Sequence, residues 1–271
     1  MPVVTLLNQK GGVGKTSCTH HLAGTLALAF GKRVLIVDTD PQSSLTQGWW
    51  GPATTRQLDP AVTITAVLRG ARPHPDQVIH STGLAGVELV PGSRTASSFN
   101  TPDPYLTDPE SQGVLRSFLE EIAGRYDLVL IDCPPNLHFC SWTALAASDH
   151  LVVPLQPEDY GAQGIADVLE SLARVRVAGF PVGLLGYLIT MVSPRRTLHQ
   201  LYEEQLRELY GRQVFTARVP ESPEFPEAIS RRQTIAQYKP KGAAAKAIRG
   251  LAEEILERIT AAGTQGQEVA A

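Results

Sequence analysis

Residues 8–16, Asn-Gln-Lys-Gly-Gly-Val-Gly-Lys-Thr, place three glycines and two lysines directly after a run of apolar residues. Glycines let backbone N–H groups approach an anion closely, and a helix that begins at such a loop adds partial positive charge at its N-terminus. Lys15 is placed to neutralise β- and γ-phosphates, and the Thr16 hydroxyl is placed to bind Mg²⁺. The spacing therefore predicts a site for a nucleoside triphosphate.

The loop departs from the usual phosphate-binding pattern at one position. That pattern has a glycine five residues before Gly14, where this chain has Gln9, and a second lysine, Lys10, follows at once. A purely structural glycine turn is the alternative, but the order strand, loop, helix favours phosphate binding. The residues expected to bind the triphosphate are Lys10, Gly11, Gly12, Val13, Gly14, Lys15, Thr16 and Ser17.

Two other apolar segments end in aspartate. Residues 33–38 end at Asp38, with Asp40 two positions later, and residues 128–132 end at Asp132. In open α/β sheets ligands bind at the carboxyl ends of the strands. We therefore expect these carboxylates at the same edge of the sheet as the glycine-rich loop, although a strand-end aspartate can also simply cap a helix.

The elements that must position these residues alternate along the chain. Apolar runs separated by amphipathic segments predict an α/β domain with a mostly parallel, twisted sheet and helices on both faces. Expected strands are 3–7, 33–38, 87–90, 128–132, 150–154 and 182–190; expected helices are 16–30, 64–69, 114–124, 141–147, 161–178 and 198–210, and residues 92–112 are expected to be a long loop.

The end of the chain is predicted as one more helix followed by a short tail. The helix places Ile248, Leu251, Ala252, Ile255, Leu256 and Ile259 on one face. We expect that face to pack on the sheet. Residues 1–262 then form a single domain, and the small, polar residues 263–271 form a flexible tail.

Composition excludes several classes of protein. Of 271 residues, 43% are apolar and 19% charged, which suits a globular core and not a disordered chain. The three cysteines, Cys18, Cys133 and Cys140, form no CxxC pair, so we expect buried thiols in a reducing cytoplasm. No secretory leader and no apolar run of about 18 residues is found, which predicts a soluble, cytoplasmic protein.

Charge is distributed unevenly. Residues 174–249 contain 13 Lys or Arg and 6 Asp or Glu, a balance of +7, whereas the net charge of the chain is −3, so the remainder carries −10. Such asymmetry suggests a surface for a polyanion. Ordinary solvated helix faces are the alternative.

The segment Lys10-Gly-Gly-Val-Gly-Lys-Thr16 resembles the deviant Walker A box of the ParA/MinD family of P-loop ATPases. The resemblance implies a single-domain P-loop NTPase fold that binds ATP and Mg²⁺ and forms a homodimer around ATP. It also implies that Lys10 reaches across the dimer to the partner's nucleotide, as a cation supplied in trans. On this basis the catalytic residues are Lys10, Lys15 and Asp40.

Further segments extend the resemblance over most of the chain, from residue 3 to about 260. Asp38-Thr-Asp-Pro-Gln42 resembles the family's DxDPQ motif, in which Asp40 positions or polarises the attacking water and Asp38 lies near the metal. Leu128-Val-Leu-Ile-Asp132-Cys-Pro-Pro resembles Walker B, whose aspartate holds Mg²⁺ through water. Residues 147–165 resemble the family stretch in which Pro154 and Gln156 shape a strand exit. The metal-binding residues implied are Thr16, Asp38 and Asp132.

Residues outside the nucleotide site favour the ParA/Soj-type DNA-partitioning branch. Leu-Ile-Thr-Met-Val-Ser-Pro-Arg-Arg-Thr-Leu-His-Gln, residues 188–200, resembles the segment in which an arginine before threonine contacts non-specific DNA. This chain departs from some relatives by placing Glu221 and Glu224 after Val-Pro, where those relatives carry arginines. The residues expected to bind DNA are Arg195, Arg196, Arg218, Arg231, Arg232, Lys239 and Lys241.

Two features found in other members of the family are expected to be absent from this chain. The final helix has a mixed polar face and no bulky apolar tail, which argues against membrane docking of the MinD type. The first strand begins at residue 3, so we expect no N-terminal helix-turn-helix and no sequence-specific operator binding.

The resemblance implies a partitioning ATPase. An ATP-bound dimer would bind double-stranded DNA without sequence preference, and a ParB-like centromere-binding partner would stimulate hydrolysis, moving a plasmid or chromosome origin on the nucleoid. Three alternatives stay open: a positioning ATPase for a non-DNA cargo, a membrane-associated division-site regulator, and a metabolic ligase or kinase.

Overall fold

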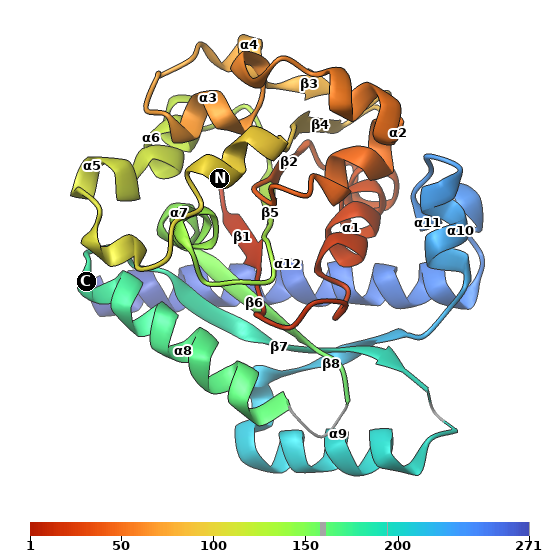
Figure 1. Cartoon of the computed structure of the whole chain (residues 1–271). Helices are drawn as coiled ribbons and strands as arrows, with labels where there is room; N and C mark the ends of the chain where they lie inside the picture. The colour runs from red at the N-terminus through yellow and green to blue at the C-terminus, as the bar shows by residue number, and fades with distance from the viewer. Residues whose placement is uncertain (158–160, 194, 271) are drawn as a thin grey trace.

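The computed structural model describes residues 1–157, 161–193 and 195–270. Within these residues one eight-stranded sheet has the order β3-β4-β2-β5-β1-β6-β7-β8, as seen in Figure 1. Every pairing is parallel except that of β3 with β4. The strands are β1 Val3–Leu6, β2 Val34–Asp38, β3 His80–Ser81, β4 Val87–Val90, β5 Leu128–Asp132, β6 His150–Leu155, β7 Gly183–Val192 and β8 Val214–Pro220. The mostly parallel α/β fold predicted from the sequence is confirmed.

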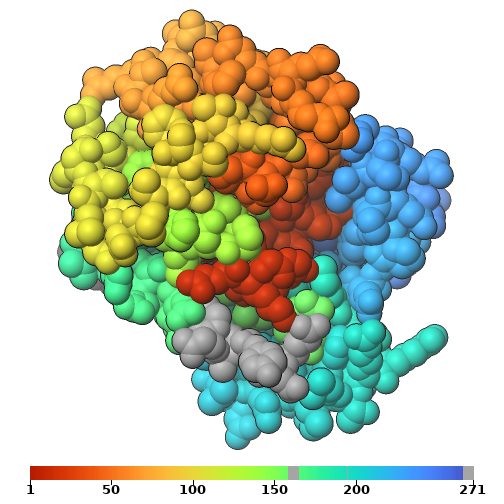
Figure 2. All heavy atoms as spheres, viewed as in Figure 1, coloured from red at the N-terminus to blue at the C-terminus, as the bar shows by residue number. Residues whose placement is uncertain are grey.

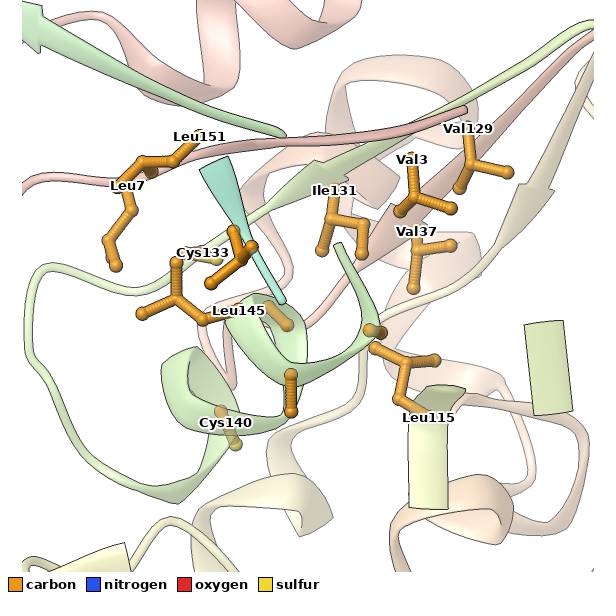
Figure 3. Packing of buried hydrophobic residues seen from close by; sticks show 14 of the residues in the cluster. Val3, Leu7, Val37, Leu115, Val129, Ile131, Cys133, Cys140, Leu145 and Leu151 are labelled. Carbon is orange, nitrogen blue, oxygen red and sulfur yellow. The ribbon is translucent and has the colours of Figure 1, made fainter. Parts of the chain in front are cut away.

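The central strands are buried on both faces, which is why they read as uninterrupted apolar runs. Alternate residues of each strand enter two separate cores. Val3, Val37 and Ile131 pack on one face, as Figure 3 shows. Val4, Ile36 and Leu130 pack on the other. This alternation fixes the strand register, because a slip by one residue would exchange the two faces.

Helices cover both faces of the sheet (Figure 1). The helices α1 and α12 pack on one core, and α6, α7 and α8 contribute to the other. The helices are α1 Lys15–Phe30, α2 Ser44–Gln57, α3 Ile64–Leu68, α4 Pro75–Val78, α5 Pro109–Gln112, α6 Val114–Glu121, α7 Phe139–Ala147, α8 Gly161–Val177, α9 Thr197–Tyr210, α10 Glu224–Ser230, α11 Ile235–Tyr238 and α12 Ala243–Ala270. Four 3-10 helices are η1 Pro60–Val62, η2 Arg94–Ser98, η3 Pro104–Leu106 and η4 Gly211–Gln213 within the described residues.

The prediction of a long loop at 92–112 was wrong in part. This segment contains η2, η3 and α5, and the Asp108 carboxylate starts α5 by accepting from the Ser111 N–H. These pieces are too short to produce a helical apolar period, so the sequence pattern did not reveal them.

Several elements were not predicted at all. Helix α2 contains Gly51 at φ 85° followed by Pro52, and this break hides its periodicity. Strand β8 lies at the edge of the sheet and mixes buried, partly buried and exposed residues without a regular period, and α10 and α11 are short. These elements are held by partners distant in the sequence, which local patterns do not encode.

The last helix packs on the sheet, as predicted. Ile248, Leu251, Ala252 and Ile255 are fully buried. The Arg258 guanidinium donates to the carbonyls of Leu185 and Val214 at 2.9 and 3.1 Å, which ties α12 to β7 and β8. Helix α12 continues to Ala270. The flexibility predicted for residues 263–271 stays a prediction, and Ala271 lies outside the described residues.

Two further expectations concern cysteines and membranes. The thiols of Cys18, Cys133 and Cys140 are all free and buried, as predicted. Among the helices of the described residues, none combines the length and the apolar character needed to cross a bilayer.

Candidate functional site

The glycine-rich loop joins β1 to α1 and lies at the carboxyl ends of the central strands. Gly12 and Gly14 have φ values of 79° and 86°, a region that side chains rarely adopt. The N–H of Cys18 donates to the Gly14 carbonyl at 2.8 Å, which begins the helix at the loop. In Figure 2 part of the N-terminal segment, in red, is visible at the surface near the centre of the view. The backbone is therefore shaped to meet an anion at the start of a helix.

The remaining residues of the predicted phosphate site lie on the same turn. Val13 is buried, whereas Thr16 and Ser17 are half-buried in the first turn of α1. Lys10 is half-buried, and its backbone N–H donates to Asn8 Oδ1 at 2.9 Å. The loop is therefore held from within by Asn8.

The Lys15 ammonium is buried beneath this loop. Its Nζ donates to the carbonyls of Asn8 and Lys10 at 2.9 and 3.1 Å. Burial lowers the pKa of Lys15, and the nearby charges of Asp132 and Asp40 oppose that shift. The lysine is thus already positioned under the loop and close to the carboxylates.

Asp132 ends β5 beside the end of β2, where Asp38 is its Cα partner. The Asp132 side chain is fully buried, and within the described residues neither carboxylate oxygen has a hydrogen-bond partner. Burial, with Asp38 as the next cause, raises the pKa of Asp132 well above its usual range. The Thr16 hydroxyl and the Lys15 charge oppose this shift only in part. A bound cation would therefore stabilise the ionised form of this buried carboxyl group.

Asp38 is fixed by the segments that follow it. Its Oδ2 accepts from the Thr46 N–H at 2.9 Å and from the Thr46 hydroxyl at 2.7 Å. The Thr46 hydroxyl also accepts from the Gly92 N–H at 2.8 Å. A Cβ on Gly92 would lie 2.8 Å from the Asp38 carboxyl carbon, so only glycine fits there. Burial raises the pKa of Asp38 to about 7.

Asp40 lies two residues beyond the strand and keeps a small exposed fraction of 7%. Its Oδ1 accepts from the Gln42 N–H at 2.8 Å. Burial raises its pKa, whereas the Gln42 hydrogen bond and the Lys15 charge lower it. Asp40 is therefore a partly solvated carboxylate at the mouth of the site.

These groups suit a magnesium ion together with phosphates. Mg²⁺ is usually bound by one or two carboxylates, water and substrate phosphates, and seldom by a cage made of protein alone. Asp132 supplies a buried carboxylate whose oxygens have no hydrogen bond of good geometry in the described residues. Asp38 lies next to it, and the Thr16 hydroxyl lies at the start of α1. No group of three or more His, Cys, Asp or Glu arranged for a metal occurs in the part of the chain that is described.

Sequence reasoning missed four supporting residues. Asn8 donates through Nδ2 to the Pro154 carbonyl at 2.7 Å and so links the loop to β6. The Thr190 hydroxyl lies 2.9 Å from the Val13 carbonyl and links the loop to β7. Thr46 and Gly92 act on Asp38, as described above. The one visible signal was Asn8 itself, which directly follows the first apolar run.

The predicted DNA-binding cations lie on three segments of the chain. Arg195 and Arg196 precede α9, Arg218 lies on β8, and the rest surround α10 and α11. Three of them face carboxylates: Arg196 and Glu221 at 3.6 Å, Arg218 and Glu203 at 2.9 Å, and Lys239 and Glu224 at 3.1 Å. The other predicted cations are Arg231 above the Tyr238 ring, Arg232 donating to the Gln47 carbonyl, and the exposed Arg195 and Lys241.

Comparison with known proteins identifies a matching family and several relatives of this chain. A family described as "AAA domain" matches residues 1–179. The chain is 38% identical over 258 residues to the chromosome-partitioning ATPase Soj of Thermus thermophilus, which covers 94% of this chain and 96% of that protein. It is 33% identical over 259 residues to the chromosome partitioning protein ParA of Caulobacter vibrioides, which covers 94% of both chains.

A solved structure with the same fold contains nucleotide. Cobyrinic acid a,c-diamide synthase of Mycobacterium smegmatis, with bound ADP and magnesium, is 25% identical with a TM-score of 0.79 over 96% of each chain. The phosphate loop, the buried strand-end carboxylates and the Soj and ParA relatives agree with one another. The chain belongs to the ParA/MinD family of P-loop ATPases.

Proposed function

We propose that this protein is a DNA-partitioning ATPase whose ATP-bound dimer binds DNA without sequence preference. Hydrolysis, stimulated by a ParB-like partner at a centromere-like site, releases the dimer and moves a plasmid or chromosome origin. The observation that carries the proposal is the buried Lys15 with the charges of Asp132 and Asp40 close to it, and with Asp38 as the strand partner of Asp132. The relatives Soj and ParA are chromosome-partitioning proteins, which supports partitioning as the use of this ATPase activity. The proposed location is the cytoplasm, on the nucleoid.

The nucleotide half of the proposal assigns a task to each group. Backbone N–H groups of residues 11–16 receive the phosphates at the start of α1. The Lys15 ammonium exchanges its two loop carbonyls for phosphate oxygens, and its burial strengthens that attraction. Thr16, Asp38 and Asp132 would hold Mg²⁺, which neutralises charge on the phosphate oxygens when bound.

Asp40 is the candidate that orients the attacking water. Its Oδ1 is fixed by the Gln42 N–H, and no hydrogen bond to its Oδ2 occurs among the described residues. Burial raises the pKa of Asp40, whereas the Gln42 hydrogen bond and the positive charge of Lys15 lower it. The lysine therefore favours the ionised form of this carboxyl group. A positioned carboxylate of this kind contributes by orienting water and accepting its proton.

Lys10 is the proposed cation in trans. It is half-buried in the loop, and its carbonyl accepts a hydrogen bond from the Lys15 ammonium. A second copy placed face to face would bring each Lys10 to the other copy's phosphates, where a charge supplied only on closure stabilises the transition state. ATP binding and dimer formation are then one event.

The DNA half relies on charge alone. Phosphate contacts carry no sequence information and weaken as salt rises. Arg195, Arg196, Arg218, Arg231, Arg232, Lys239 and Lys241 supply the cations. The balance of +7 over residues 174–249 supports such a surface.

A second candidate is a ligase acting on a small molecule. It is favoured by the likeness to the M. smegmatis cobyrinic acid a,c-diamide synthase. In that case hydrolysis would respond to a small carboxylic acid acceptor and not to DNA. The two candidates share the nucleotide site, so only the acceptor or partner distinguishes them.

The test is retention on duplex DNA of unrelated sequence with ATP, with ADP and without nucleotide. The proposal predicts retention with ATP only, and loss of retention in Arg196→Glu. That variant keeps its hydrolysis in the absence of DNA, because the Arg196 side chain is 59% exposed and pairs with Glu221, and among the described residues Arg196 has no hydrogen bond or ion pair with the phosphate loop. Retention that is equal in all three nucleotide states would contradict the proposed cycle.

A further inference from the structure

Two glutamates lie among the cations where β7 and β8 end. The N–H of Glu221 donates to the carbonyl of Val192 at 3.0 Å, so the turn after β8 lies beside the turn after β7. Glu221 Oε2 lies 3.6 Å from Arg196 Nη2 across these turns. Glu224 begins α10, and its Oε1 lies 3.1 Å from Lys239 Nζ.

These groups form one surface, which we call the Arg196–Lys239 surface. It consists of Arg195, Arg196, Glu221, Glu224, Lys239 and Lys241. Its four cations and two carboxylates give a net charge of +2, and each carboxylate is paired with a cation suited to DNA phosphate. The turn before α9 and the helices α10 and α11 lie on the same side of the molecule in Figure 1.

The Arg196–Glu221 pair is exposed, and in the second pair the side chains of Lys239 and Glu224 are 46% and 24% exposed. The side chains of Arg196 and Glu221 are 59% and 58% exposed. Ion pairs in such a position contribute little to stability because water and salt screen them. A phosphate group offers the same negative charge and more acceptor oxygens, so it can replace the carboxylate.

A structural ion pair in this chain looks different. Glu254 pairs with Arg258 at 2.8 Å, and the Glu254 carboxylate also accepts from the N–H groups of Thr216 and Ala217. Its removal would leave two backbone N–H groups of β8 and the Arg258 guanidinium without this acceptor. In the described part of the chain the Glu221 carboxylate has only its ion pair with Arg196, and the turn is held by its backbone.

We propose that Glu221 and Glu224 are internal competitors of DNA phosphates on the Arg196–Lys239 surface. The proposal rests on the DNA binding proposed above. Each carboxylate holds its cation until a phosphate replaces it, so DNA binding here is an exchange of one anion for another. The surface is consequently weak in a single copy, and it binds when two copies present it together and releases when they separate.

The expected changes follow from the strength of exposed ion pairs. Glu221→Gln and Glu224→Gln each raise the affinity for duplex DNA about two- to fivefold, and the double variant raises it about four- to twentyfivefold. A cation that no longer pairs with a carboxylate neutralises a DNA phosphate and so releases counterions from the DNA. The slope of log affinity against log salt concentration therefore becomes steeper by about one per position.

The experiment measures fluorescence anisotropy of a labelled duplex of unrelated sequence, titrated with the ATP-bound protein at several salt concentrations. The matched control is Glu208→Gln, which makes the same change in net charge on α9 at an exposed residue that has no ion pair in the described structure. A second series repeats Glu221→Gln in an Arg196→Gln background. A double-mutant cycle of this form isolates the pair from the total charge.

The outcomes separate the two proposals. The competition is supported if the Gln variants gain more affinity for duplex DNA than the Glu208→Gln control does. The gain of Glu221→Gln must also disappear in the Arg196→Gln background. Gains equal to the control, or a Glu221→Gln gain that persists without Arg196, overturn it while nucleotide-dependent binding of the unaltered protein upholds the proposed function. If neither the unaltered protein nor any Gln variant binds DNA, both proposals fail.

Discussion

Asp38 and Asp132 are Cα partners at the ends of the neighbouring strands β2 and β5, and both carboxyl groups are fully buried. The Asp38 carboxylate accepts two hydrogen bonds from Thr46, whereas neither Asp132 oxygen has a hydrogen bond of good geometry in the described residues, and only the nearby Thr16 hydroxyl and the Lys15 charge lower the pKa of Asp132. Two buried carboxyl groups side by side cannot both be charged cheaply without a cation. The fold is therefore least stable when both carboxyl groups are ionised, which is the form that binds a metal ion.

Asp132→Asn should stabilise the protein free of nucleotide and metal. The pKa of Asp132 is raised in the fold, so its contribution to stability is present at low pH and is lost as pH rises through that folded value. Asparagine cannot ionise, and the free energy of unfolding should exceed that of the unaltered protein by on the order of 1–3 kcal/mol at pH 8. Urea unfolding at pH 5 and pH 8 measures this.

The same variant should lose ATP hydrolysis by about 10²-fold or more, since the carboxylate that holds Mg²⁺ is gone. Stability and activity then change in opposite directions. An Asp132→Asn protein that is destabilised at pH 8, or that hydrolyses ATP normally, would contradict the assignment of Asp132.

Gly92→Ala should disturb Asp38 from the far side of the site. The new Cβ would lie 2.8 Å from the Asp38 carboxyl carbon and 2.9 Å from the Ser43 hydroxyl, so the strand ends must shift. Overpacking of this kind costs about 1–3 kcal/mol. Gly250→Ala on α12 has open space and is the control; it should leave the melting temperature unchanged or higher. Equal melting temperatures for the two variants would rule out the close approach.

A pair of buried histidines predicts sensitivity to acid. His20 and His21 on α1 are buried, and burial lowers the pKa of His20 to about 4 and that of His21 to about 3. The unfolded chain takes up protons below about pH 6.5 while the fold does not, so stability is present above that pH and falls toward pH 4. Each histidine contributes on the order of 1 kcal/mol per pH unit in this window.

His21→Asn should reduce that slope. The Ile235 N–H donates to His21 Nδ1 at 3.0 Å, and the asparagine carbonyl can accept the same hydrogen bond without titrating. The exposed His74→Asn is the control. Urea unfolding from pH 4.5 to 6.5 should show a shallower loss for His21→Asn alone, and identical slopes for all three proteins would refute the argument.

Asp40→Ala should separate binding from hydrolysis. Loss of the water-positioning carboxylate leaves the phosphate loop and Lys15 intact, so ATP still binds. Hydrolysis should fall at least about 10²-fold. The variant should then stay on DNA in ATP after the unaltered protein has been released, as followed by dissociation from an immobilised duplex. Release at the normal rate would exclude Asp40 from that role.

Much of the nucleotide site was predictable because its residues are consecutive. Residues 10–17 form the loop and the start of α1, and Asp38 and Asp132 end strands whose apolar runs identify them from the sequence alone. The family resemblance added their expected roles, which no sequence period could supply.

The supporting residues were not predictable for a physical reason. Thr46 and Gly92 meet at Asp38 although 46 positions separate them, and Thr190 reaches the Val13 carbonyl across 177 positions. Such contacts arise only once the sheet has formed. The pairing of Arg196 with Glu221 belongs to the same class, although the two glutamates after Val-Pro were visible as a departure from the family pattern.

The most direct test of the account is the mass of the Asp40→Ala protein in solution with Mg²⁺ and ATP, measured by sedimentation, with Lys10→Ala added as a second variant. The account predicts twice the 29.2 kDa of the single chain for Asp40→Ala in ATP, the single-chain mass in ADP, and the single-chain mass in ATP once Lys10 is removed. A single-chain mass for Asp40→Ala in saturating ATP, or an unaltered dimer without Lys10, would contradict it.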